Sequence, residues 1–144
     1  MVSVKFPKSH KRSGEKTNFE TDILTLKKAH TIRSNFELWE KRFAEIEKGN
    51  AVLSVRYWAD KAYRSKQIEI IQFNKESGIG IQKIRISKCK ITNILTGLVN
   101  DRRIVPAYNL SKNDGLSLGD FEDWFKNYDL SGPMVIIHFS PMRY

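Results

Sequence analysis

Residues 26–35, L-K-K-A-H-T-I-R-S-N, lie between two helix-start signals and so decide how the first part of the chain folds. Residues 17–20 precede this stretch and residues 34–37 close it. Each has the form of a capping box, in which Thr or Ser stands three residues before Glu. We therefore predict a first helix that runs to about Lys28 and a second helix that starts at Ser34. Residues 29–33 are then a short extended connection.

Apolar side chains recur at helical spacing after each capping box, as expected of helices that pack against a core. They are Phe19, Ile23 and Leu26 after the first box, and Phe36, Trp39, Phe43 and Ile46 after the second. Gly49 ends the second helix. Late in the chain, Ser117 is placed to cap a third helix, with Asp120 three residues beyond it.

Strand patterns occupy much of the remaining chain. Residues 3–6, 51–58, 66–73, 79–86 and 134–139 are strand candidates, and residues 89–95 either continue the fourth or add a sixth. Segment 134–139, M-V-I-I-H-F, is apolar on both faces, which is typical of a strand covered on both sides. Because strands and helices do not alternate regularly, we predict an α+β fold with a small, mostly antiparallel barrel or curled sheet.

Length and charge limit the classes of protein to consider. A chain of 144 residues favours a single domain, residues 1–144, with a flexible basic loop at about 8–16 that is either solvated or contacts phosphate. A formal net charge of +9 attracts polyanions such as RNA, although lysine can equally serve solubility. One cysteine, no apolar run of bilayer length and no signal-peptide stretch predict a cytoplasmic protein without a membrane partner.

No motif predicts a metal ion or a cofactor. The three histidines, His10, His30 and His138, lie far apart, and Cys89 is the only cysteine, so the usual spacing of metal ligands is missing. The G-I-G at residues 78–80 leads into a strand rather than a helix, and no GKS or GKT follows. That pattern excludes a phosphate-binding P-loop.

Lys28, Thr31 and Arg33 form a candidate site within the opening stretch. A threonine hydroxyl becomes a nucleophile when a base removes its proton. A lysine can be that base when burial or nearby positive charge lowers its pKa. An acidic partner must relay protons or hold the lysine, and local spacing does not identify it. We expect the three side chains to line one polar cleft.

Arg56 and Trp58 form a second candidate group because they alternate with the core-facing residues of the strand at 51–58. Tyr63 lies just beyond that strand. An aromatic ring beside a guanidinium can stack a base and contact phosphate. The alternative is that Trp58 packs under a loop or helix while Arg56 pairs with an acid.

Several motifs, in this order, resemble the ASCH domain of the PUA-like superfamily. They are K-A-H-T-I-R at 28–33, L-S-V-R-Y-W at 53–58 with A-D-K-A-Y-R-S after it, and N-D-G-L-S-L-G-D-F-E-D-W-F at 113–125. The resemblance spans roughly residues 5–139 and extends to a branch of small, often phage-associated ASCH-like proteins. It implies a PUA-like β-barrel with flanking helices and a cleft beside the first helix.

The resemblance also implies a function. Members of the family are mostly inferred to bind RNA, and one branch hydrolyses N4-acetylcytidine with a lysine, a threonine and a glutamate. By motif these roles fall on Lys28, Thr31 and Asp114, where aspartate replaces glutamate and is one methylene shorter. The resemblance also implies that the insertion between Thr31 and the strand at residue 51, a whole helix here, is longer than the one the compact hydrolases carry.

Three hypotheses therefore remain open. The first is an RNA- or nucleotide-binding domain with a polar cleft beside the first helix; its binding residues would be Arg33, Arg56, Trp58 and Tyr63. The alternative is an amidohydrolase that acts on an N4-acylated cytidine-type nucleoside through Lys28, Thr31 and Asp114. The third is a protein-interaction module that retains only a relic of the cleft.

Overall fold

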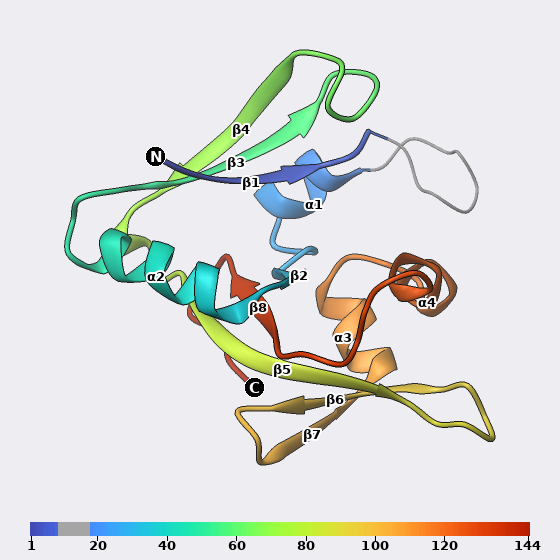
Figure 1. Cartoon of the computed structure of the whole chain (residues 1–144). Helices are drawn as coiled ribbons and strands as arrows, with labels where there is room; N and C mark the ends of the chain where they lie inside the picture. The colour runs from blue at the N-terminus through green and yellow to red at the C-terminus, as the bar shows by residue number, and fades with distance from the viewer. Residues whose placement is uncertain (9–17) are drawn as a thin grey trace.

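The structure, a computed structural model, describes residues 1–8 and 18–144 and has an α+β fold (Figure 1). Most of the predicted loop at 8–16 and the predicted cap at Thr17 lie outside the described residues. The helices are α1 (Phe19–Leu24), α2 (Phe36–Glu47), α3 (Ala107–Asn113) and α4 (Leu118–Phe125), with a 3-10 turn η1 (Lys75–Ser77).

The strands form two sheets. One has the order β1-β3-β4 and consists of β1 (Val2–Phe6), β3 (Leu53–Trp58) and β4 (Gln67–Phe73). The other has the order β2-β8-β5-β6-β7 and consists of β2 (His30–Ser34), β8 (Met134–His138), β5 (Gly80–Lys88), β6 (Leu95–Val99) and β7 (Arg103–Pro106). Only the β1–β3 pair is parallel among the pairs within the described residues.

This arrangement confirms the α+β class and the mostly antiparallel pairing. Within residues 1–8 and 18–144, the two sheets do not close into a barrel. The three-stranded sheet and α1 lie on one side of β2 and β8, and α3 and α4 lie on the other (Figure 1).

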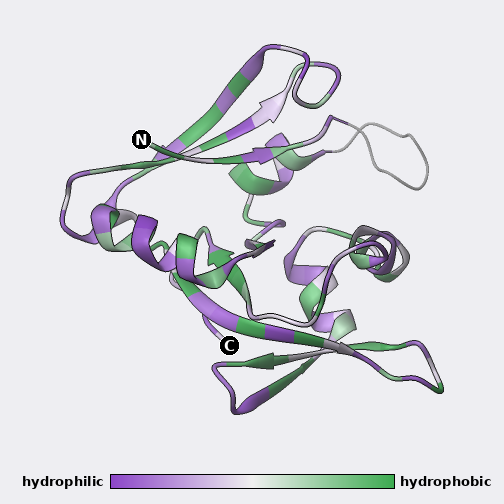
Figure 2. Ribbon diagram, in the orientation of Figure 1, coloured by the Kyte–Doolittle hydropathy of each residue, from purple (hydrophilic) through white to green (hydrophobic). Residues whose placement is uncertain are grey.

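Strand β8 lies between two hydrophobic cores because its side chains alternate between them. Val135 and Ile137 pack in the core formed with β1, β3, α1 and α2, whereas Met134 and Ile136 pack in the core under α3 and α4. All five residues of β8 are buried, which confirms the prediction of a strand covered on both faces. The strand is correspondingly hydrophobic along most of its length (Figure 2).

The opening stretch folds differently from the prediction at both ends. The first helix ends at Leu24, because Leu26 adopts a left-handed backbone with φ of 60°. The residues expected as a connection form β2, which pairs along its length with β8. The second helix is capped by Asn35, whose Oδ1 accepts a hydrogen bond from Leu38 N at 3.2 Å, so the predicted cap at Ser34 is wrong. Asparagine tolerates the φ of 66° required there.

The predicted tally of three helices and five or six strands misses α3 and the β6–β7 hairpin. Residues 89–94 form a turn, and β6 begins only at Leu95. The third predicted helix is α4, and its cap is confirmed because Ser117 Oγ accepts a hydrogen bond from Asp120 N at 3.2 Å.

Candidate functional site

Lys28 and Asp114 face each other across an isolated antiparallel bridge between the segment just before β2 and the residue that follows α3. The Lys28 ammonium donates hydrogen bonds to the Asp114 carboxylate and, at 2.7 Å, to the Asp114 carbonyl oxygen. The exposed fractions of the two residues are 1% and 4%. Each buried charge therefore has a partner, which is the condition for burying ions in a protein.

The neighbourhood of Lys28 is otherwise aromatic. Its Nζ lies 4.4 Å from the ring centroid of Phe19 and 5.1 Å from that of Phe6. Burial lowers the pKa of Lys28 and raises the pKa of Asp114, and the attraction between the two opposes both shifts. Because both shifts favour the neutral form of each group, Lys28 binds its proton less firmly than an exposed lysine does.

Thr31 and Arg33 alternate along β2 and their side chains meet. Arg33 Nη1 donates a hydrogen bond to Thr31 Oγ1 at 2.6 Å, and Arg33 Nη2 donates one to the carbonyl oxygen of Lys5 at 3.0 Å. Thr31 is buried, whereas Arg33 is half-buried. The charge of Arg33 also lowers the pKa of both Lys28 and Asp114, so the four side chains form one polar cluster.

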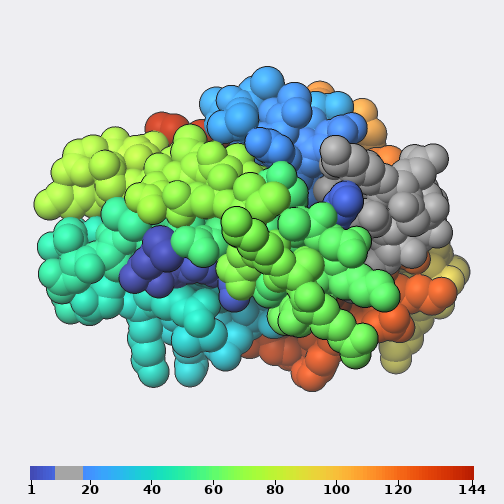
Figure 3. Space-filling view, turned by 90° about the horizontal axis from the view of Figure 1, so that it is seen from above, coloured from blue at the N-terminus to red at the C-terminus, as the bar shows by residue number. Residues whose placement is uncertain are grey.

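Trp58 and Tyr63 form an aromatic pair on the three-stranded sheet. Their ring centroids are 5.3 Å apart, and Lys5 Nζ lies 5.6 Å from the Trp58 ring. Trp58 belongs to neither core, yet it is only 8% exposed. Tyr63 is 86% exposed and has a φ of 64°, which is unusual for a bulky residue. The β3–β4 segment that carries it spreads over the face seen in Figure 3.

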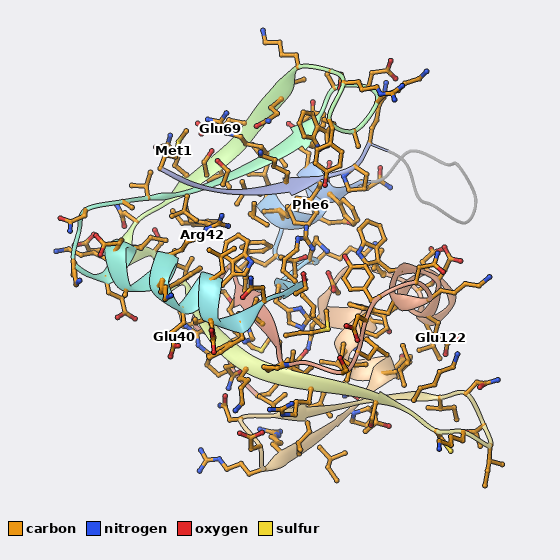
Figure 4. The ribbon with its side chains drawn as sticks, in the orientation of Figure 1. Met1, Phe6, Glu40, Arg42, Glu69 and Glu122 are labelled. Atoms are coloured by element: carbon orange, nitrogen blue, oxygen red, sulfur yellow. The ribbon has the colours of Figure 1, made fainter. Side chains whose placement is uncertain are left out.

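Arg56 is occupied by contacts within the sheet. Its Nε donates to Ser54 Oγ at 2.8 Å, and its Nη2 lies 3.5 Å from Glu69 Oε2. Figure 4 shows Glu69 on the outer side of this sheet and Phe6 on the inner side. The contacts of Arg56 match the alternative in which it pairs with an acid.

The structure thus brings Lys28, Thr31, Arg33 and Asp114 together in one cluster. Lys5 links this cluster to the aromatic pair, because its carbonyl oxygen accepts from Arg33 and its ammonium lies over Trp58. Tyr63 also influences the pKa of Arg33 electrostatically. The side chain of Arg56 bonds to Ser54 and Glu69 rather than to these residues, although Arg56 pairs with Lys5 in the register of β1 and β3.

A second polar network lies beside the cluster, and the sequence motifs do not predict it. The Tyr144 hydroxyl lies 2.6 Å from His30 Nε2 and accepts a hydrogen bond from Asn113 Nδ2 at 2.9 Å. Gln82 Oε1 accepts from Tyr144 N at 2.9 Å and lies 2.9 Å from His138 Nε2. His30 directly precedes Thr31 and Asn113 directly precedes Asp114. The network therefore adjoins the cluster on both of the segments that the Lys28–Asp114 bridge connects.

Three pockets lie on the described part of the chain at sites away from the cluster, and Lys28, Thr31 and Asp114 line none of these three. One lies between the β5–β6 turn and α4, one lies at the start of α2, and one lies beside α3.

Among the described residues, no group of three His, Cys, Asp or Glu side chains is placed to hold a metal ion. The helices described are all too short or too polar to cross a membrane.

In comparisons with known proteins, no family model, no curated protein and no solved structure matches this chain.

Proposed function

We propose that this chain is an ASCH-like domain of the PUA-like superfamily that binds RNA or a nucleotide. The observation that carries the proposal is the exposed ring of Tyr63 against Trp58, with the Lys5 ammonium beside the indole. Arg33 adjoins this pair through Lys5 and is the half-buried member of the polar cluster.

A base fits this arrangement for physical reasons. Every base has a π-face that can stack on an aromatic ring, and Tyr63, which is 86% exposed, contacts the buried Trp58 ring in a tilted pair and leaves most of its own surface open. The left-handed backbone at Tyr63 is a strained conformation of the kind that collects at binding sites. Lys5 and Arg33 supply positive charge for the phosphates, and the net charge of +9 attracts them from a distance.

Binding of a labelled single-stranded RNA across a salt series tests this proposal. We expect affinity to fall as salt rises, because phosphate contacts release counterions. Tyr63→Ala should weaken binding by ~1–3 kcal/mol, whereas Tyr63→Phe keeps the ring and the affinity. Ile104→Ala, which removes an exposed apolar side chain on β7, is the control. Equal affinities for wild type and Tyr63→Ala would contradict the proposal.

A second candidate function, hydrolysis of an N4-acylated cytidine-type nucleoside, is favoured by the ion pair between Lys28 and Asp114. Aspartate is shorter than the glutamate of the resembling hydrolases, but the backbone bridge brings it close enough to contact Lys28. Burial also lowers the pKa of Lys28, which favours the neutral amine that a general base requires.

In this candidate mechanism, Thr31 Oγ1 attacks the acyl carbonyl carbon and its proton passes to neutral Lys28. Arg33, which already donates to Thr31 Oγ1, stabilises the negative charge on the acyl oxygen. Lys28 returns the proton to the departing cytosine amine, and water then cleaves the acyl-threonine ester. Since Thr31 is buried under Arg33, the substrate has to replace the contact between these two side chains.

Turnover of N4-acetylcytidine, followed by chromatography, tests the hydrolase. We expect Thr31→Ala to abolish turnover and Thr31→Ser to retain it, while Thr25→Ala, at an exposed threonine after α1, leaves the rate unchanged. Equal rates for wild type and Thr31→Ala would remove Thr31 from the mechanism. No turnover by the wild type would leave the binding proposal alone.

A further inference from the structure

A pocket beside α3 presents two lysines and an exposed tyrosine behind the Lys28–Asp114 bridge. Its lining residues are Lys27, Tyr108, Ser111, Lys112, Gly115, Leu116, Ser117 and Leu118. None of them belongs to the polar cluster or to the aromatic pair. The sequence motifs predict no role for Tyr108 or Lys112, because α3 itself is not predicted.

The fold assembles this pocket from three segments. Tyr108 and Lys112 are four residues apart on α3 and so share one face of that helix. The Lys28–Asp114 bridge then places Lys27 beside Gly115. While Lys28 is buried against Asp114, its neighbour Lys27 is exposed and faces this pocket. The same bridge therefore separates a buried ion pair from an open basic surface.

The charge of the lining distinguishes this pocket from the pockets beside α4 and at the start of α2. Both of the others include carboxylates: Glu122 and Asp123 in one, Glu37 and Asp129 in the other. The lining of this pocket carries two ammonium groups and no carboxylate. Two acids that adjoin the lining in sequence are engaged, because Asp120 accepts a hydrogen bond from Ser117 Oγ at 3.0 Å and Asp114 pairs with Lys28.

Tyr108 adds a surface for a ring. It lines the pocket and is 64% exposed, so its ring is accessible to a ligand. An aromatic ring next to two cations offers a nucleotide both a stacking partner for its base and counter-charges for its phosphate.

We propose that this pocket binds the phosphate of a nucleotide between Lys27 and Lys112, with the base against Tyr108. The nucleotide is either a unit of an RNA chain or a free nucleoside monophosphate, and the recognition chemistry is the same for both. As a second site on RNA, the pocket rests on the proposed function; as a site for a free nucleotide, it stands independently of it.

The RNA arm compares two double variants with the same loss of charge. Lys27→Gln with Lys112→Gln removes the pocket cations, and Lys41→Gln with Lys90→Gln removes two exposed lysines from α2 and the β5–β6 turn. For single-stranded RNA, each lost phosphate contact reduces the slope of log affinity against log salt by about 0.7, and the pocket pair, which holds one phosphate, should reduce it by that amount. The control pair should leave the slope unchanged.

The free-nucleotide arm follows backbone amide NMR signals as adenosine 5′-monophosphate or adenosine is added. We expect the amides of Tyr108, Gly115 and Ser117 to shift with the monophosphate, but not with adenosine, and not in the Lys27/Lys112 double variant. Shifts without any RNA binding would assign the site to free nucleotides and refute only the RNA proposal. A changed slope without shifts would assign it to RNA. An unchanged slope together with unshifted amides would overturn the pocket proposal, whatever the effect of Tyr63→Ala.

Discussion

The Lys28 ammonium donates to both the side-chain carboxylate and the main-chain carbonyl oxygen of Asp114, a residue 86 positions away in the chain. One aspartate therefore satisfies the lysine twice. Because one of the two acceptors is backbone, the ion pair holds the end of α3 against the start of β2 and does not merely neutralise a charge.

Removing one partner should cost more than removing both. Asp114→Ala leaves the Lys28 ammonium buried without its carboxylate, and we expect the free energy of unfolding to fall by ~3–5 kcal/mol. The double variant Lys28→Met with Asp114→Leu leaves no charge behind and should regain most of that loss. Urea unfolding measures both. A loss below ~1 kcal/mol for Asp114→Ala would show that the pair is not buried in solution.

Gly115→Ala should destabilise the protein through the same bridge. Gly115 has a φ of 70°, and an added Cβ would lie 3.0 Å from Lys28 Cβ. The left-handed backbone alone costs an alanine ~1–2 kcal/mol, and the contact with Lys28 adds to this. Gly132→Ala is the matched control, because an added Cβ meets nothing within 4 Å there. Thermal unfolding should separate the two variants, and equal melting temperatures would contradict this prediction.

Tyr144→Phe removes the hydroxyl that connects His30 to Asn113. His30 is fully buried, so the loss leaves polar groups without a partner, and we expect a decrease of ~1–3 kcal/mol in the free energy of unfolding. Tyr108→Phe removes an exposed hydroxyl and should change stability by less than ~0.5 kcal/mol. The comparison uses chemical denaturation at neutral pH; similar values for the two variants would mean that the hydroxyl of Tyr144 contributes nothing.

Stability should fall in mild acid because of His138. Burial, with a smaller contribution from the charge of Arg143, lowers the pKa of His138 from 6.5 to about 3. The folded state therefore prefers the neutral ring, and the unfolded state takes up the proton first. Stability is complete above pH ~6.5 and declines as pH falls towards 3, by up to ~1.4 kcal/mol per pH unit for this residue. Buried His30, whose pKa is also lowered, acts in the same direction.

Denaturation at several pH values between 7 and 4 measures this effect. His138→Gln retains a side chain that can bond to Gln82 but cannot be protonated, so its stability should depend less on pH over this range. A profile as steep as that of the wild type would assign the acid sensitivity to other groups.

The sequence predicts those elements whose signals are local and strong. The apolar run of β8 and the Ser117 cap are examples, and both depend only on neighbouring residues. α3 is not predicted because Pro106 precedes it and no side chain caps it, and β7 has only four residues. The start of α2 is misplaced by one residue because Asn35 competes with Ser34 as the cap, and only the turn out of β2 decides between them.

In the candidate site, too, the residues with local sequence signals are predicted and those joined only by long-range contacts are not. The motifs single out Lys28, Thr31 and Asp114, and the fold brings them into one cluster. The contact of Arg33 with Thr31 follows from strand alternation, since the two residues share a face of β2. The bond between His30 and Tyr144 joins residues 114 positions apart, and no local pattern contains that information.

The position of β8 has a consequence for how the molecule folds. This strand completes both cores and pairs with β2 about 100 positions earlier and with β5, so neither core is closed until it docks. Contacts over such sequence distances slow folding, because a long chain must be ordered before they form. During synthesis on the ribosome, the apolar faces of the earlier strands therefore stay exposed until residues 134–138 emerge. A chaperone can bind these faces during that time.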